Sequence, residues 1–282
     1  MGFCDVLNQN VIYNFAMIVW LASYPKSGNT WLRAIISTLT NSTDGKFRPE
    51  FLDKIPAFPN YSDFKKFTDY TYNIDEVKKF WIADQERLNL DNKIKFIKTH
   101  HINCAIDGYR FTNKENTLAV IYIIRDPRNV VTSVSNYLEM KLEDATQRIT
   151  NPLIYGSKND IITLVGSWSQ NYNSWKNAKN LYLLKYEDLI KNAHNEIDKL
   201  IIFLKKKCNM EIKIDVDEVV KSTSFEELQN MEKEKLLNLP LMNKQKFFNQ
   251  GKKNKWQNNL KKELVKKIET SFKNEMIELG YL

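Results

Sequence analysis

Three segments of the chain share one pattern, in which a short apolar run is followed by a polar turn and then by a stretch with helical apolar spacing. The apolar runs cover residues 18–23, 118–124 and 181–184. Runs of this kind are typical of strands buried on both faces, and a helix after each one brings the next strand back in parallel. The pattern therefore predicts an α/β fold, with a parallel β-sheet flanked by helices on both faces in a three-layer sandwich.

Each predicted strand is followed by one face of apolar side chains at helical spacing. These faces comprise Leu32, Ile35, Ile36 and Leu39; Val130, Val131, Val134, Tyr137 and Leu138; and Ile197, Leu200, Ile201 and Leu204. A fourth strand is expected over residues 94–99, and a long polar helix after Asn258. Ligands of such folds bind at the carboxyl ends of the strands, so the functional residues are expected there.

Composition bounds the class of protein without choosing a function. Neither a repeat nor a low-complexity linker divides the chain, so residues 17–282 are expected to form a single domain, with 1–16 as an extension outside it. The net charge of +8 fits an anionic ligand, a nucleic acid or an acidic membrane, although solvated lysines alone would explain it. Three scattered cysteines and no secretory or membrane segment indicate a cytoplasmic protein.

The first turn, Tyr24-Pro25-Lys26-Ser27-Gly28-Asn29-Thr30-Trp31, joins a strand to a helix and has the elements of a phosphate site. Gly28 permits a tight turn that exposes backbone amides, and the Lys26 ammonium and the helix N-terminus add positive charge. The order differs from the nucleotide-triphosphatase signature, in which lysine follows the glycine. The alternative is a plain turn in which Ser27 or Asn29 caps the helix.

The second predicted strand ends at Arg125, where Asp126-Pro127 has the form of a helix cap followed by a first-turn proline. Ser133 lies eight residues after Arg125, on the helix flank away from Val130, Val134 and Tyr137. An arginine fork and a serine hydroxyl at this spacing could hold one phosphate. Arg125 could instead pair with Asp126 or with the C-terminal helix.

These segments resemble PAPS-dependent sulfotransferases, which use 3′-phosphoadenosine-5′-phosphosulfate (PAPS) and have a fold like that of P-loop nucleotide kinases. PKSGNTW is similar to the family's PKSGTTW phosphosulfate loop, and RDPRNVVTSVSNY to its 3′-phosphate segment. The resemblance extends from about Met17 to the C-terminus. It implies a role in PAPS binding for Lys26, Ser27, Gly28, Asn29, Thr30, Trp31, Arg125 and Ser133. It also implies one for Tyr186 of a YED motif, and for Thr223 and Phe225 of a TSF segment.

The C-terminal segment over residues 247–256 resembles the family's FxRKGxxGxW loop but departs from it. Phe247, Gly251 and Trp256 match, whereas Asn249 and Gln250 replace the arginine and lysine expected to grip the 3′-phosphate. The resemblance places Gln250, Gly251 and Lys252 at the nucleotide. Lys252, Lys253 or Lys255 could supply the missing charge, and the sequence leaves that choice open.

The family's KTH motif is matched by Lys98-Thr99-His100 and carries its general base on the histidine. Strand alternation places Lys98 and His100 on one side, with Thr99 and His101 on the other. His100 is therefore the expected base, with Lys98 and Lys26 as catalytic cations. A register slip of one residue would make His101 the base. A zinc site built from His100, His101 and Cys104 has too few ligands, so no metal is expected.

The expected reaction is in-line transfer of a sulfuryl group from PAPS to a hydroxyl or amine of a small-molecule acceptor, leaving adenosine 3′,5′-bisphosphate. The alternatives are a P-loop-type kinase or nucleotide phosphotransferase, and a PAPS-binding protein without activity. No nucleic-acid or membrane partner is expected, and the oligomeric state stays open. Aromatic residues between positions 47 and 81 could line an acceptor pocket or form the core of a helical cap.

Overall fold

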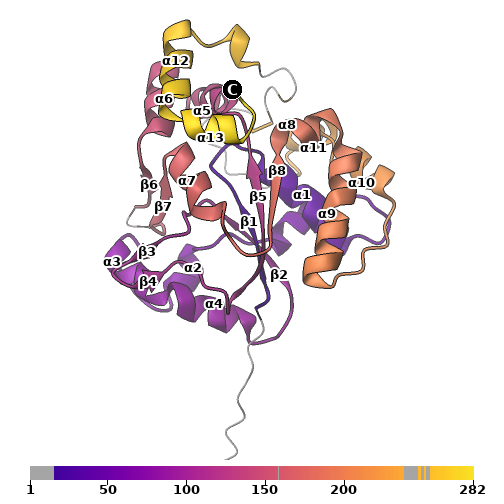
Figure 1. Ribbon diagram of the computed structural model, residues 1–282. Coiled ribbons are helices and arrows are strands. Elements are labelled where there is room, and N and C mark those ends of the chain that lie inside the picture. The colour runs from indigo at the N-terminus through magenta and orange to yellow at the C-terminus, as the bar shows by residue number, and fades with distance from the viewer. Residues whose placement is uncertain (1–15, 158, 238–246, 249–250, 252–254) are drawn as a thin grey trace, which may run out of the picture.

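The computed structural model describes residues 16–157, 159–237, 247–248, 251 and 255–282 (Figure 1). Its centre is a sheet of four parallel strands in the order β2-β1-β5-β8. These are the four strands that the apolar runs predicted, each with bounds shifted by one or two residues at most. Their ranges are β1 (Ile18–Ala22), β2 (Lys95–Thr99), β5 (Thr117–Ile124) and β8 (Leu181–Lys185).

Helices and two small antiparallel ribbons surround the sheet. The ribbons pair β3 (Ala105–Ile106) with β4 (Tyr109–Arg110), and β6 (Leu153–Tyr155) with β7 (Thr163–Gly166). The first helical elements are α1 (Asn29–Asn41), η1 (Pro49–Lys54), α2 (Tyr61–Phe64), α3 (Ile74–Val77), η2 (Lys78–Phe80), α4 (Trp81–Asn89), α5 (Pro127–Leu138), α6 (Leu142–Thr150) and α7 (Trp168–Trp175). They are followed by α8 (Tyr186–Lys191), α9 (Ala193–Cys208), α10 (Val216–Ser222), α11 (Phe225–Lys233), η4 (Trp256–Asn258), α12 (Lys262–Ser271) and α13 (Lys273–Glu278). Within the described ranges, every helix lacks the length and apolar character that a membrane crossing requires.

Alternate side chains of the strands enter two separate cores. Trp20 of β1 belongs to one core, which includes residues of α4, α5, α6, α7, α12 and α13, whereas Leu21 belongs to the other, which includes residues of α1, α9, α10 and α11. Both residues are fully buried, as expected for a parallel sheet covered on both sides. The predicted three-layer α/β fold is confirmed (Figure 1).

Two regions differ from the simplest expectation. The polar segment after Asn258 forms two helices, α12 and α13, because Phe272 between them turns into the core and packs 5.1 Å from the Trp168 ring. The aromatic residues between positions 47 and 81 form a helical cap whose core includes Phe58 and Trp81. Of the two interpretations of that region, the helical cap is the one that the structure supports.

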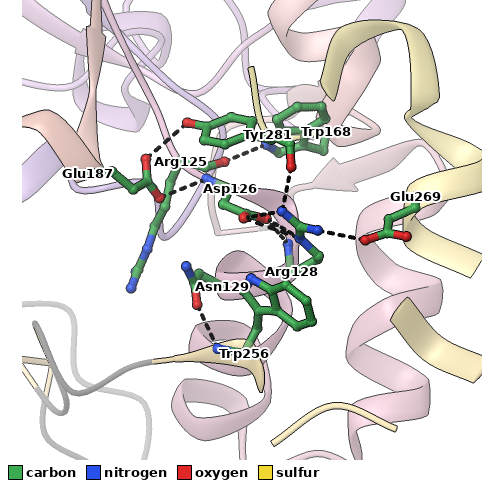
Figure 2. A network of polar contacts seen from close by, with 9 residues as sticks. All are labelled: Arg125, Asp126, Arg128, Asn129, Trp168, Glu187, Trp256, Glu269 and Tyr281. Carbon is green, nitrogen blue, oxygen red and sulfur yellow. Dashed lines mark hydrogen bonds and ion pairs between the residues drawn. The ribbon is translucent and has the colours of Figure 1, made fainter. Parts of the chain in front are cut away.

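A network of polar contacts fixes the C-terminal helices to the end of β5 (Figure 2). Asp126 caps α5 as expected, accepting from the Arg128 amide at 2.9 Å, and also binds the Arg128 guanidinium. The same guanidinium forms an ion pair with Glu269 of α12 at 2.6 Å and donates to the Tyr281 carbonyl at 2.8 Å. Tyr281 in turn donates to Glu187, which accepts from the Asp126 amide. We call Asp126, Arg128, Glu187, Glu269 and Tyr281 the C-terminal clamp.

Candidate active site

A cavity of about 430 Å³ lies at the carboxyl edge of the sheet. Its walls come from the turn after β1, the end of β2, the loop after β5, helix α5 and the start of α8. Most of the residues proposed from the sequence meet here although they are far apart along the chain. Those that line the cavity are Lys26, Gly28, Asn29, Thr30, Trp31, Lys98, His100, Arg125, Ser133, Tyr186, Phe225 and Gly251.

The turn before α1 leaves the amides of the helix N-terminus without a side-chain cap. Gly28 is the N-cap residue, with φ 102°, and neither Ser27 nor Asn29 caps the helix. A side chain at Gly28 would place its Cβ 2.6 Å from the Tyr186 ring, so only glycine fits. Lys26 also has a positive φ, 66°, which turns the backbone into a concave nest of the kind that binds anions.

Three of the predicted nucleotide residues, Ser27, Asn29 and Thr223, are buried in the fold. Asn29 donates its amide to the Leu21 carbonyl at 2.9 Å and to the Ser23 hydroxyl at 3.1 Å. Thr223 is buried and donates to the Val219 carbonyl at 2.7 Å, away from the cavity lining. Ser27 is buried without a hydrogen-bond partner for its hydroxyl, and it too is absent from the lining.

Arg125 points into the cavity. Its guanidinium carbon lies 4.2 Å from the centre of the Tyr186 ring, and Nη1 donates to the Lys26 carbonyl at 3.2 Å. Its buried Nε has no partner within the structure described. The alternative pairing with Asp126 and the C-terminal helix belongs to Arg128, and Figure 2 shows Arg125 turned away from that network.

The Lys26 ammonium lies between two aromatic rings, 3.8 Å from the centre of Tyr137 and 4.0 Å from that of Phe247. Burial lowers the pKa of Lys26 to about 8, and the neighbouring Arg125 charge acts in the same direction. A bound anion would favour the charged form again. Among the described residues Lys26 forms no ion pair, although the Glu232 charge raises its pKa slightly against the two larger effects.

The cavity wall at the end of β2 carries His100 and Lys98, as strand alternation predicted. The His100 Nδ1 lies 2.8 Å from the Ser23 carbonyl, which can only accept, so in the neutral ring Nδ1 carries the proton and Nε2 keeps its lone pair. Burial, and then the Lys98 charge, hold the pKa of His100 well below its ordinary value. Burial and the Arg33 charge lower the pKa of Lys98 to about 8.

His101 lies on the opposite side of the strand end, within the core. Its ring stacks on Phe111 at 4.2 Å with an interplanar angle of 5°, and it meets Trp81 edge-on at 4.9 Å. Its Nδ1 donates to the Ile102 carbonyl at 2.6 Å, and Nε2 is buried. The register that puts His100 at the cavity and His101 in the core is the one that the structure adopts.

Charge around the cavity has one sign. Five cationic side chains line it, and none of the lining residues described is acidic; the five are Lys26, Arg33, Lys98, Arg125 and Arg148. Such a cavity suits an anionic ligand. The expected contributions of Gln250 and Lys252, and the substitution at Asn249, lie outside the described residues, whereas Gly251 packs against the Phe225 ring.

Sequence reasoning missed one end of the cavity. Tyr24, Leu138, Leu153, Tyr155 and Arg148 form this end, which we call the acceptor end. The aromatic residues between positions 47 and 81, considered above for this role, do not line the cavity. Tyr24 adjoins the phosphate turn and could have been found from it. Leu138 directly follows the 3′-phosphate motif on α5, and the others come from α6 and β6, in which no motif was recognised from the sequence.

Comparison with known proteins agrees with the motifs. The sulfotransferase domain family matches residues 18–280. Sulfotransferase 1E1 of Bos taurus is 27% identical over 91% of this chain and 82% of its own length. Retinol dehydratase in complex with retinol and PAP has a similar fold, with a TM-score of 0.60, 16% identity and coverage of 94% and 83%. Mouse sulfotransferase SULT7A1 complexed with PAP also has a similar fold, with a TM-score of 0.57, 20% identity, and coverage of 94% of this chain and 87% of its own. From its motifs, its cavity and this match over nearly its whole length, the chain belongs to the sulfotransferase family.

Proposed function

We propose that this sulfotransferase transfers the sulfuryl group of PAPS to a hydroxyl or amine of a small acceptor and releases adenosine 3′,5′-bisphosphate. One observation carries the proposal. Lys26, His100 and Arg125, from three different strand ends, reach the same cavity, whose described lining contains no carboxylate. PAP-bound structures of related fold add support.

The residues present fit the nucleotide. The uncapped amides at the start of α1 and the Lys26 ammonium would hold the 5′-phosphosulfate, because both offer positive charge and no described acid forms an ion pair with Lys26. Arg125 and Ser133 would hold the 3′-phosphate, and the free Nε of Arg125 leaves a donor for it. Trp31 and Phe225 line the same cavity and offer rings to the adenine. Bound PAPS supplies an activated sulfuryl group with a good leaving group.

His100 is the proposed general base. Its Nδ1 is committed to Ser23, so the lone pair on Nε2 is available to take the acceptor proton. As that proton moves to Nε2, the acceptor oxygen or nitrogen forms its bond to sulfur, and the bond between sulfur and the 5′-phosphate oxygen breaks. The electron pair of the broken bond stays on the phosphate, where Lys26 offsets the growing charge. Lys98 lines the same wall and would offset negative charge on the sulfuryl group, and its charge keeps His100 neutral before the reaction.

The rival activities are less well supported. A kinase of the P-loop type needs acidic side chains to hold magnesium at the phosphates, and no described residue of the cavity lining is acidic. A PAPS-binding protein without activity has no need of a histidine whose Nδ1 is fixed and whose ring lines the cavity.

Nucleotide binding and transfer are tested separately. Adenosine 3′,5′-bisphosphate at 100 times its Kd should stabilise the folded protein by about 2.7 kcal/mol, whereas ATP with magnesium at the same concentration should do so much less. An acceptor screen with isotopically labelled PAPS, read as mass gain by the acceptor, tests transfer. Stabilisation by ATP alone would favour the kinase, and binding without transfer to any acceptor would favour the inactive PAPS binder.

A further inference from the structure

The acceptor end of the cavity is apolar except for the Arg148 guanidinium and the hydroxyls of Tyr24 and Tyr155. Leu138 and Leu153 line it together with the rings of Tyr24 and Tyr155, and Arg148 of α6 enters the same wall. An apolar pocket with one fixed charge is a typical design for recognising a small molecule by a single polar group. The charge is the feature that needs an explanation.

Arg148 has no ion pair in the structure described. Its near neighbour on α6, Asp144, lies one turn away but forms no ion pair with it, and Glu143 instead contacts Lys261 at 3.5 Å. Its one aromatic contact places the guanidinium carbon 5.5 Å from the centre of the Tyr155 ring, a distance typical of a weak interaction. Among the residues outside the described ranges, the sequence offers a single acid, Asp5.

A second polar group beside Arg148 also lacks a partner. The Tyr24 side chain is only 2% exposed, and no described residue forms a hydrogen bond with its hydroxyl. Tyr24 and Arg148 line the same cavity; burial, and then the neighbouring Tyr155, raise the pKa of Tyr24, and the Arg148 charge opposes that rise. An unsatisfied buried hydroxyl is costly, so this end of the cavity is incomplete without a ligand that accepts a hydrogen bond.

The nucleotide does not account for these two groups. The proposed binding groups for its phosphates are the turn before α1 and the Arg125 side chain, neither of which belongs to α6. Ser23, which fixes His100, directly precedes Tyr24 in the chain. The acceptor end is therefore adjacent to the proposed base, on the side where the acceptor must lie.

We propose that the acceptor is a hydroxyl compound with an apolar or aromatic body and a carboxylate, and that Arg148 binds the carboxylate while the Tyr24 hydroxyl donates to it. This assignment deepens the proposed function and rests on it. The acceptor hydroxyl then points toward His100, and the body lies between Leu138, Leu153 and Tyr155. A guanidinium fork matches a carboxylate with two parallel hydrogen bonds.

The test compares matched acids and amides in the complex with adenosine 3′,5′-bisphosphate. The probes are 4-hydroxyphenyl alkanoates of increasing chain length and their primary amides, which have the same shape without the charge. Calorimetry should show the best acid binding about 10- to 100-fold more tightly than its amide, the range expected of a hydrogen bond to a charged group. The same preference should appear in kcat/KM with PAPS.

Variants assign the preference to a residue. Arg148→Gln should remove most of the acid preference while lowering binding of the amide far less, and Arg148→Lys should restore part of it. Arg110→Gln, an exposed arginine on β4 away from the cavity lining, is the matched control and should keep the wild-type preference.

Each outcome separates the two proposals. Equal binding of acid and amide by the wild type would overturn the assignment of an anionic acceptor. A preference that survives in Arg148→Gln would move the carboxylate to another cation, such as Arg33, and overturn the role of Arg148. Failure of the wild type to bind adenosine 3′,5′-bisphosphate, measured first, would count against the proposed function itself.

Discussion

The adjacent histidines His100 and His101 permit a test in which one substitution removes activity and the other removes stability. His100 lines the cavity, and within the part of the chain that the structure describes its ring hydrogen-bonds to Ser23. His100→Ala should lower kcat by about 10²- to 10⁴-fold, the usual range for loss of a general base. The loss of about one hydrogen bond should change the unfolding free energy by only ~1 kcal/mol.

His101 is fully buried in an aromatic cluster, stacked 4.2 Å from Phe111. His101→Ala leaves a cavity there. Truncation of larger buried rings costs about 3–5 kcal/mol, so we expect roughly 2–4 kcal/mol for the smaller imidazole. For a chain of this size that corresponds to a fall in Tm of about 4–16 °C. The folded fraction should keep kcat within about threefold of wild type.

The assay combines urea unfolding, thermal melting and initial rates at saturating PAPS and acceptor, with binding of adenosine 3′,5′-bisphosphate as a check on the site. If His101→Ala does not fold, His101→Gln is used in its place, because glutamine retains a hydrogen-bonding side chain at that position. The reasoning is refuted if the roles are exchanged, with His100→Ala stable and active and His101→Ala stable but inactive. Full activity in both variants would show that neither histidine removes the proton.

Three further predictions follow from the site and the fold. Lys26 and Lys98 have a pKa of about 8 and act as cations, so kcat/KM should fall above that pH as they lose their protons. Below pH 8 the rate should stay level until well below the usual histidine range, because the pKa of His100 is depressed. A profile that rises above pH 8 would contradict this reasoning. Gly28→Ala should weaken binding of adenosine 3′,5′-bisphosphate by at least about tenfold, because its Cβ would lie 2.6 Å from Tyr186, whereas Gly108→Ala, also at positive φ but with open space around it, should leave the affinity unchanged in calorimetry. Arg128→Gln should lower the unfolding free energy by about 3–5 kcal/mol, because it leaves Asp126 buried without its cation. The control is Arg48→Gln, whose side chain is 42% exposed and whose urea midpoint should stay unchanged. An unchanged midpoint for Arg128→Gln as well would argue against the clamp.

Much of the fold and half of the site could be predicted because their signals are local. The four buried strands, the Gly28 turn and the Asp126 cap each depend on a few consecutive residues. Strand alternation, together with the KTH resemblance, separated His100 from His101. These features can be predicted from the sequence because side-chain periodicity and burial act on residues that are neighbours in the chain.

Long-range packing determined what the sequence left open. No local pattern brings Arg148 of α6 next to Tyr24, or places the rings of Tyr137 and Phe247 around Lys26. In the sequence, Arg125 is a candidate for pairing with the C-terminal helix, whereas the three-dimensional arrangement assigns that pairing, with Glu269, to Arg128. Asn29 could be recognised as polar, but its attachment to Leu21 depends on how α1 lies against β1.

The C-terminal clamp has a consequence for the order in which a nascent chain acquires its structure. The strands of the sheet are complete once Lys185 has been synthesised, but Arg128 and Glu187 must await Glu269 and Tyr281. Until then Arg128 has Asp126 but lacks Glu269, and Glu187 lacks the Tyr281 hydroxyl, at the strand end from which Arg125 enters the cavity. A chain emerging from the ribosome can therefore assemble its sheet early while the nucleotide end of the cavity stays unfinished. Ligand-binding competence should appear late, as a post-translational event.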